Sequence, residues 1–233
     1  MFGTITGQSP IHLVLLGAPG VGKGTFASRI GPHYNIPAIS TGDLVRAEIK
    51  KPNSSVGAEI KSISERGGLV SDSIILNMLQ SRLQEHDAQN GFLLDGFPRR
   101  VTQADALNSM TYVSAVLNIT LREDILINKI CSRRVCSKCG RNYNLADIHE
   151  GEYVMPPLLP RKSGICDNDG GELIQRNDDT ENIVRDRLKN YQDETYPLIE
   201  YYNKRGLLLT WDVKKGLDDT NELLAYLDKH LRQ

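Results

Sequence analysis

The sequence predicts an α/β fold in which a five-stranded parallel sheet is flanked by helices. Five short apolar runs recur along the 233 residues, and segments with helical periodicity separate them. Most of these runs lack the in/out alternation that a half-exposed strand would have. A parallel sheet accounts for both observations, because its strands are covered on both faces and are joined by helical crossovers.

The expected strands are the apolar runs themselves. In chain order they span residues 11–17, 35–40, 91–96, 114–120 and 206–212. Each run is short and bounded by glycine, proline or polar residues, as is typical of buried strands.

Two of the expected helices have clear boundaries and faces. The segment 71–83 begins with Ser71 or Asp72 as a helix cap, and its apolar residues Ile75, Leu79 and Leu83 are four residues apart. The segment 218–231 has the same design, with apolar residues at Leu223, Leu227 and Leu231.

Two segments interrupt the alternation of strands and helices. Residues 41–70 are polar and helical without a strand, and residues 133–179 contain three cysteines, a proline-rich stretch and many glycines. We therefore expect a core formed by residues 1–39, 71–131 and 180–233, into which units at 40–70 and 132–179 are inserted.

The composition is ordinary for a soluble globular protein and does not favour binding to a polyanion. Lysine and arginine total 28 against 29 acidic residues, so no global positive field is available to hold a nucleic acid. The first ten residues have no apolar run of signal-peptide length, and no segment approaches the ~18 apolar residues of a membrane span. We expect a cytoplasmic monomer with neither a nucleic acid nor a membrane as partner.

The first expected strand leads into a glycine-rich loop, GAPGVGKGT, at residues 17–25. Its glycines let the backbone N–H groups curl around phosphate oxygens at the start of a helix, where anions are already favoured. Lys23 completes the pattern GxxxxGK of a P-loop NTPase-type core. Gly24 occupies the position that is usually Ser or Thr, and Thr25 follows it. The loop predicts a nucleotide phosphate site.

Three of the four cysteines have the spacing of metal ligands. Cys136 and Cys139 form a CxxC pair, and Cys166 with Asp169 forms a CxxD pair after 26 intervening residues. Four such ligands close a tetrahedral, structural Zn²⁺ site, since zinc accepts carboxylate oxygen as well as thiolate. Asp167 is a rival for the fourth ligand, although adjacent ligands cannot form the knuckle. Cys131 is expected to pack in a helix.

The loop and four further segments together resemble a family. These segments are STGDLVRAEI from Ser40, GFLLDGFPRRVTQA from Gly91, SRRVCSKCGRNY from Ser132 and QRNDDTENIVRDRL from Gln175. They cover nearly the whole chain and resemble the adenylate kinases, in the long form with a zinc-binding lid. The resemblance implies reversible transfer, ATP + AMP = 2 ADP, which maintains adenine nucleotide balance. It also implies that 40–70 is an AMP-binding domain and 132–179 a lid.

The resemblance further implies an AMP site and a set of charged groups for transfer. The implied AMP contacts are Thr41, Arg46, Gly68, Leu69, Val70, Gly96, Phe97, Pro98, Arg99, Gln103, Arg176 and Arg187. The amide of Gln103 offers a donor and an acceptor, which suits the adenine edge. The implied catalytic groups are Lys23, Arg99, Arg133, Arg176 and Arg187. Asp95 is the implied anchor for the water shell of Mg²⁺ bound with ATP.

The implied ATP site departs from the family at one position. Its residues are Gly20, Val21, Gly22, Lys23, Gly24, Thr25, Lys129, Arg133, Asn142, Tyr143 and Lys215. Lys129 stands where the family usually has an arginine that stacks on the donor base, and lysine has no planar face. A GTP:AMP phosphotransferase is therefore the alternative function. A zinc-ribbon nucleic-acid-binding protein is the alternative from another class, although few aromatic residues flank the knuckles.

Overall fold

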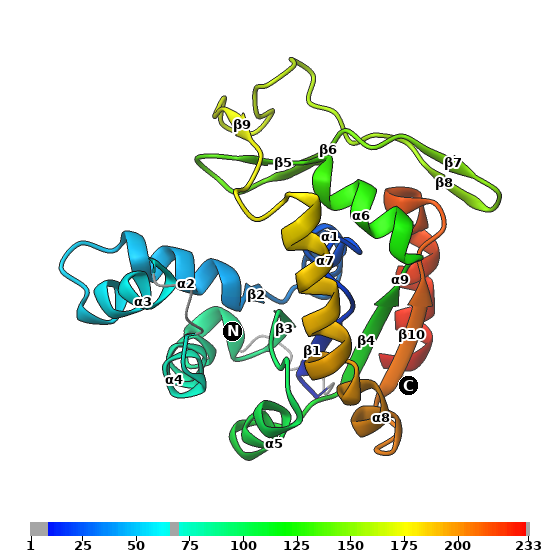
Figure 1. Cartoon of the computed structure of the whole chain (residues 1–233). Helices are drawn as coiled ribbons and strands as arrows, with labels where there is room; N and C mark the ends of the chain where they lie inside the picture. The colour runs from blue at the N-terminus through cyan, green and yellow to red at the C-terminus, as the bar shows by residue number, and fades with distance from the viewer. Residues whose placement is uncertain (1–8, 66–69, 232–233) are drawn as a thin grey trace, which may run out of the picture.

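The centre of the computed structural model, which describes residues 9–65 and 70–231, is a five-stranded parallel sheet. The strand order is β10–β4–β1–β3–β2 (Figure 1). The strands are β1 (Ile11–Leu16), β2 (Ala38–Ser40), β3 (Gly91–Asp95), β4 (Ala115–Thr120) and β10 (Leu208–Asp212). The predicted fold class is confirmed.

The second strand is shorter than the sequence suggested. It begins at Ala38 instead of residue 35, because Asn35 ends the preceding helix in a left-handed conformation with φ 53°. Pro37 follows and has no N–H to donate to a sheet. The other four strands end within two residues of the predicted limits.

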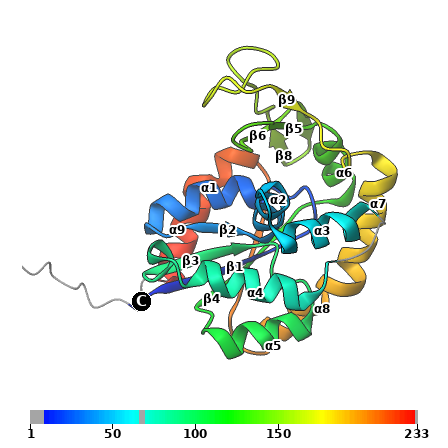
Figure 2. The same cartoon turned by 90° about the vertical axis from the view of Figure 1, so that its left-hand side faces the viewer.

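Helices cover both faces of the sheet (Figure 2). On one face lie α1 (Lys23–Tyr34), α6 (Glu123–Cys131) and α9 (Thr220–Leu231). On the other lie α4 (Asp72–Leu83), α5 (Val101–Met110) and α8 (Pro197–Asn203). Along β1, Leu13 and Leu15 pack toward the first layer, while Val14 and Leu16 pack toward the second. The two-sided burial therefore accounts for the consecutive apolar residues of this strand.

The two helices with predicted faces are present. Ser71 is the cap of α4, since its hydroxyl accepts a hydrogen bond from the Ile74 N–H at 3.5 Å. Leu79 is fully buried beneath α4, and Leu223 and Leu227 are fully buried beneath α9. The periodicity in the sequence thus identified the buried face of both helices.

Two groups of elements stand away from the central sheet. The first, α2 (Thr41–Lys50) and α3 (Ser55–Glu65), projects to the left in Figure 1. The second contains a three-stranded sheet of β5 (Arg133–Cys136), β6 (Asn142–Asn144) and β9 (Leu173–Ile174), and a hairpin of β7 (Ile148–Glu150) and β8 (Tyr153–Met155). The remaining elements are η1 (His86–Ala88), α7 (Glu181–Asn190), η2 (Tyr191–Thr195) and η3 (Gly216–Asp219).

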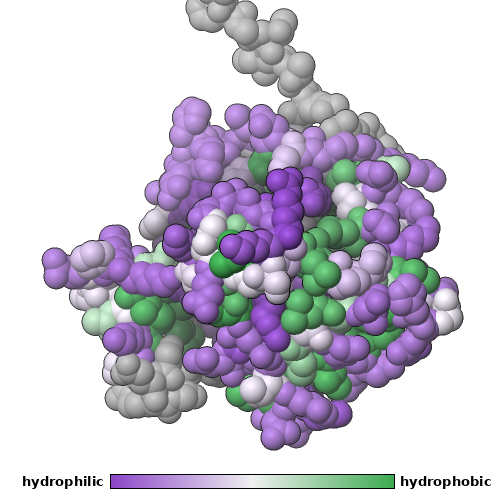
Figure 3. Space-filling model, turned by 90° about the horizontal axis from the view of Figure 1, so that it is seen from above, coloured by the Kyte–Doolittle hydropathy of each residue, from purple (hydrophilic) through white to green (hydrophobic). Residues whose placement is uncertain are grey.

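The surface seen from above is mostly hydrophilic, with smaller hydrophobic patches among the polar side chains (Figure 3). Within residues 9–65 and 70–231, no helix combines the length and the apolar character that crossing a bilayer requires.

Candidate active site and metal cluster

The glycine-rich loop connects β1 to α1 at the carboxyl end of the central strands. Gly17 and Gly20 both have positive φ angles, 142° and 83°. A Cβ atom on Gly17 would lie 2.4 Å from the Ile119 carbonyl oxygen, and one on Gly20 would lie 2.2 Å from a side-chain carbon of Ile130. Only glycine fits these two positions, so the loop stays close to the core and ends at the N-terminus of α1.

Lys23 is the first residue of α1, and its side chain folds back across the loop. Its ammonium group donates hydrogen bonds to the carbonyl oxygens of Gly17 (2.7 Å) and Ala18 (3.0 Å). Burial lowers the pKa of Lys23 to about 8, against the opposing influence of Asp95. Nearby arginines lower it further. The charged form of Lys23 is therefore disfavoured in the free protein, and a bound anion would stabilise it.

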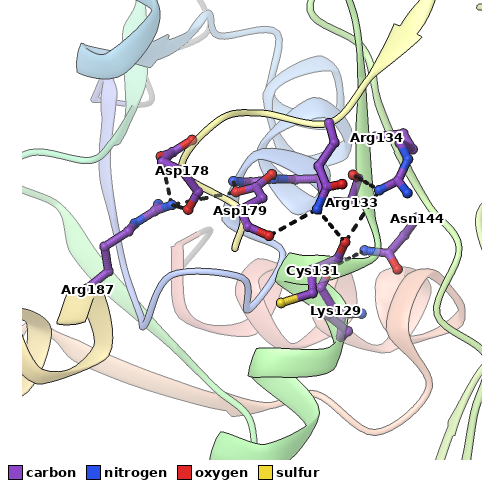
Figure 4. Close-up of polar contacts among 9 residues, drawn as sticks. Lys129, Cys131, Arg133, Arg134, Asn144, Asp178, Asp179 and Arg187 are labelled. Atoms are coloured by element: carbon purple, nitrogen blue, oxygen red, sulfur yellow. Dashed lines mark hydrogen bonds and ion pairs between the residues drawn. The ribbon is translucent and has the colours of Figure 1, made fainter. Parts of the chain in front are cut away.

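Two acidic residues that sequence analysis did not single out organise the arginines (Figure 4). Asp179 is completely buried and accepts hydrogen bonds from Arg133, one of them from Nε at 2.9 Å. Arg187 donates to Asp178 at 2.8 Å and lies 3.6 Å from Asp179. A buried carboxylate needs such partners, so Asp179 fixes two of the predicted catalytic arginines relative to each other.

Arg99 and Arg176 extend this cluster of positive groups. Arg99 donates from Nε to the Gly96 carbonyl oxygen at 2.9 Å. Desolvation and the neighbouring Arg187 lower the pKa of Arg99, while desolvation, Arg133 and Arg46 lower that of Arg176. The fold therefore brings cations from separate segments close together. A bound polyphosphate would offset their mutual repulsion.

Gly24 lies where the loop, the central sheet and the β5–β6 unit meet. A Cβ atom on Gly24 would lie 3.6 Å from Oδ2 of Asp95, at the end of β3, and 3.7 Å from Nδ2 of Asn142. Asn142 and Asp95 thus both lie beside the phosphate loop. Their contacts to the donor nucleotide and to the water shell of Mg²⁺ stay predictions.

Two of the side chains predicted to contact AMP are hydrogen-bonded to other groups of the protein. The Thr41 hydroxyl donates to the Gly96 carbonyl oxygen at 2.9 Å. Gln103 accepts from the Arg99 N–H at 2.7 Å and donates to Asp72 at 2.7 Å, so both ends of its amide have partners. An adenine that bound this amide would have to displace Asp72.

Other predicted AMP residues differ in how they can contribute. Arg46 is exposed on α2 and pairs with Asp43 at 2.5 Å. The Phe97 side chain belongs to the core, being only 1% exposed, and Pro98 is buried beside it. Both are therefore limited to shaping the backbone of the turn. Val70 is half-buried, whereas Gly68 and Leu69 lie outside the described residues.

The predicted donor-base residues face the β7–β8 hairpin and η3. The Lys129 ammonium lies 3.6 Å from the sulfur of Met155. The N–H groups of Lys214 and Lys215 both donate to the buried carboxylate of Asp219, at 2.9 and 2.8 Å. This carboxylate fixes the turn around Lys215.

Tyr143 has a structural role beside the cysteines. Its ring is 2% exposed, and its hydroxyl donates to the Cys166 sulfur at 3.6 Å and accepts from the Asp167 N–H at 2.8 Å. The side chain is thus unavailable to a nucleotide, and a contact from Tyr143 would have to come from its backbone.

The four predicted metal ligands come together. One ligand atom from each of Cys136, Cys139, Cys166 and Asp169 lies within 4.8 Å of the others. The sulfur atoms of Cys139 and Cys166 are 3.7 Å apart, and that of Cys136 is 3.2 Å from Oδ1 of Asp169. The three cysteines are free thiols. Three thiols and a carboxylate at this spacing fit a closed tetrahedral zinc site.

Local contacts favour Asp169 over Asp167 as the fourth metal ligand. The Gly171 N–H donates to Asp169 at 2.9 Å, which lowers the pKa of this carboxyl to about 2. Asp167 instead accepts a hydrogen bond from the Arg161 N–H at 2.8 Å. A Cβ atom on Gly171 would lie 2.6 Å from the Cys136 sulfur, so glycine is required for the approach of the two knuckles.

A family model described as adenylate kinase matches residues 15–207, which include the phosphate loop, the arginine cluster and the cysteines. The chain belongs to the adenylate kinase family. It is 42% identical over 224 residues to an adenylate kinase of Staphylococcus epidermidis, covering 94% of this chain and 99% of the relative. It is 42% identical over 225 residues to an adenylate kinase of Thermodesulfovibrio yellowstonii, covering 94% of this chain and all of the relative.

A plant relative is similar to the same degree. A protein of Oryza sativa named probable adenylate kinase 1, chloroplastic, is 43% identical over 213 residues, covering 90% of this chain and 72% of the relative. The arginine cluster of this adenylate kinase thus lies within a region that it shares with both bacterial and plant proteins.

Proposed function

We propose that this adenylate kinase transfers a phosphoryl group reversibly between ATP and AMP to give two ADP. The observation that carries the proposal is that Lys23 lies across the phosphate loop while Asp179 holds Arg133 and Arg187 together. Burial and the charges of Arg99, Arg187 and Arg133 lower the pKa of Lys23, in agreement with this clustering. Phosphoryl transfer requires positioning and neutralisation of spreading negative charge more than covalent chemistry.

The proposed role of each residue follows from its position in the site. Lys23 and the loop N–H groups bind the donor phosphates, while Arg99 binds the AMP phosphate. Arg133 and Arg187, held by Asp179, stabilise the charge that develops during transfer. The AMP phosphate attacks as an anion, so no general base is needed. Mg²⁺ bound with ATP would neutralise the phosphates, and Asp95 would hold its water shell.

We further propose that residues 132–179 form a lid whose shape depends on Zn²⁺. Arg133 begins β5 and Arg176 follows β9, and the two strands pair antiparallel through Val135 with Ile174. The proposed metal ligand Cys136 is also on β5. Zinc would therefore fix β5 and β9, and with them both arginines, relative to each other. Closure of the lid over both substrates would exclude water, which prevents wasteful hydrolysis of ATP. Residues 40–70 are the proposed AMP-binding domain.

The proposed reaction is tested by initial rates with AMP fixed and ATP, GTP or ITP varied. ATP is expected to have the highest kcat/KM. GTP is the second candidate donor, because Lys129 has no planar face for stacking and directs its ammonium toward Met155. A clear preference for GTP would reject ATP as donor, and no phosphorylation of AMP by any of the three would reject the proposed function. The cytoplasmic location and the monomeric state remain predictions.

The donor kcat/KM is expected to fall as pH rises above about 8. An ordinary lysine stays charged to about pH 10, but burial lowers the pKa of Lys23 to about 8. The free enzyme therefore loses this phosphate-binding charge near that pH, and kcat/KM reports groups of the free enzyme. We expect a fall approaching about tenfold per pH unit, measured with ATP from pH 6.5 to 9.5.

The matched control for this profile is Lys23→Arg, whose side chain stays charged throughout the range. If this variant retains measurable turnover, its profile should not fall near pH 8. A wild-type profile that is level to pH 9.5 would contradict the assignment to Lys23.

A further inference from the structure

The Asp72 carboxylate, at the start of α4, is hydrogen-bonded to two side chains at the start of α5. Its Oδ1 accepts from Nη2 of Arg100 at 2.7 Å and from Nε2 of Gln103 at 2.7 Å. The Asp72 side chain is 34% exposed, whereas Gln103 is only 6% exposed. A carboxylate near the surface thus reaches the buried amide that is proposed to contact the adenine of AMP.

The Gln103 amide is held at both of its ends. Its Oε1 accepts from the backbone N–H of Arg99 at 2.7 Å, and its Nε2 donates to Asp72. A backbone N–H can only donate and a carboxylate oxygen accepts, so each partner suits one end of the amide. If the amide turned over, Nε2 would meet the donor and Oε1 would meet the acceptor. The two contacts therefore fix the amide in one orientation.

We propose that Asp72 is a positioning residue that makes the acceptor site specific for adenine over 6-oxopurines, because it fixes the orientation of the Gln103 amide. The inference rests on the proposed function, since it takes Gln103 as a contact to the base of AMP. Adenine has an acceptor at N1 and a donor at its 6-amino group. Hypoxanthine has a donor at N1 and an acceptor at O6. The amide could pair with hypoxanthine in the same position only after it had turned over.

Adenine can take the place of the Asp72 oxygen without leaving this carboxylate unpaired. N1 of the base is an acceptor, as the carboxylate is, so Nε2 of Gln103 exchanges one acceptor for another. Asp72 keeps its ion pair with Arg100, which also lies 3.9 Å from Glu194. An inverted amide would instead direct Oε1 towards the displaced carboxylate. Asp72 therefore preorganises the amide before AMP binds and opposes the inverted orientation afterwards.

The test compares AMP with IMP, the nucleotide of hypoxanthine, in the wild type and in Asp72→Asn. KM is measured for AMP, and Ki is measured for IMP as an inhibitor competitive with AMP, so that IMP need not be phosphorylated. An Asn side chain can donate as well as accept, so it no longer opposes the inverted amide. The ratio of Ki for IMP to KM for AMP is expected to fall about 5- to 20-fold, while KM for ATP stays within about twofold.

Three further proteins separate this role from a general effect of the substitution. Asp72→Glu keeps the carboxylate and should return the ratio to within about threefold of wild type. Glu194→Gln removes the other carboxylate beside Arg100 and should leave the ratio within about twofold. In a Gln103→Met background, Asp72→Asn should no longer change the ratio, because its effect passes through the Gln103 amide.

Folding is monitored by thermal denaturation, because Asp72 also lies in the first turn of α4. If Asp72→Asn does not fold, Asp72→Ser takes its place and the same fall is expected, since a hydroxyl also both donates and accepts. An unchanged ratio in the folded variant, or a change that persists in the Gln103→Met background, would overturn the role of Asp72. Absence of AMP phosphorylation by the wild type would instead overturn the proposed function, and the role of Asp72 with it.

Discussion

Replacing Lys23 by methionine is expected to lower kcat for phosphoryl transfer by about 10³-fold, with the fold preserved. Methionine has a similar length but no charge, so the loop keeps its volume while the phosphoryl group loses the cation that we propose binds the donor phosphates. The effect is expected mainly in kcat, since that charge matters most when negative charge spreads in the transition state. The measurement is the initial rate with saturating ATP and AMP, together with thermal denaturation.

The control for this substitution is Lys204→Met, which removes an exposed lysine that pairs with Glu200 on α8. Its kcat should stay within about twofold of wild type, as is usual for a surface ion pair. The melting temperature of Lys23→Met should stay within a few degrees of wild type, because burial already disfavours this charge in the folded protein. A variant that retained a tenth of the wild-type kcat would show that the arginines suffice without Lys23.

Much of the fold was predictable because local and global requirements agree in this sequence. The strand β1 has an apolar residue at almost every position, and the structure uses these residues on both faces. Ser71 caps α4 as its side-chain chemistry indicates. Asn35 and Pro37 show where this agreement fails, since the apolar run around them predicted a strand but the backbone of Asn35 is left-handed.

The predicted site residues on the phosphate loop could be located from the sequence because glycine, lysine and helix start are adjacent in the chain. Asp178 and Asp179 were missed, although they follow Arg176 directly in the segment QRNDD. Two acids directly after an arginine that was predicted to bind phosphate are the clue that could have identified them. Their partners, Arg133 and Arg187, come from distant parts of the sequence, so only the fold reveals the pairing.

The hairpin was missed for a related physical reason. Each of its strands has three residues, which is too short for a clear alternation of apolar and polar positions. Its turn at Gly151 has a φ of 61°, and Ile148 and Met155 pair across it. A glycine between two short apolar stretches is compatible with a hairpin, but packing against Lys214 and Gly216 is what stabilises it, and that contact is not visible in the sequence.

Cys139→Ser is expected to reduce bound zinc from about one ion per chain to a small fraction, and to lower the melting temperature by roughly 6 to 15 °C. Cys139 is the exposed thiol of the cluster, so the substitution disturbs packing little and its effect reports the metal. If the proposed zinc holds the knuckles together, its loss would free β5 from β9 and remove the common support of Arg133 and Arg176. We therefore expect kcat to fall at least about tenfold, measured beside the zinc content by mass spectrometry.

Cys131→Ser is the matched control, since Cys131 is the one remaining cysteine and lies outside the cluster at the end of α6. It should retain zinc and kcat. Asp169→Ala should lose zinc as Cys139→Ser does, because removing the carboxylate leaves only three ligands. Full zinc occupancy in Asp169→Ala would remove this residue from the ligand set, and an unchanged melting temperature in a zinc-free Cys139→Ser protein would show that the β5–β6–β9 sheet is stable without the metal.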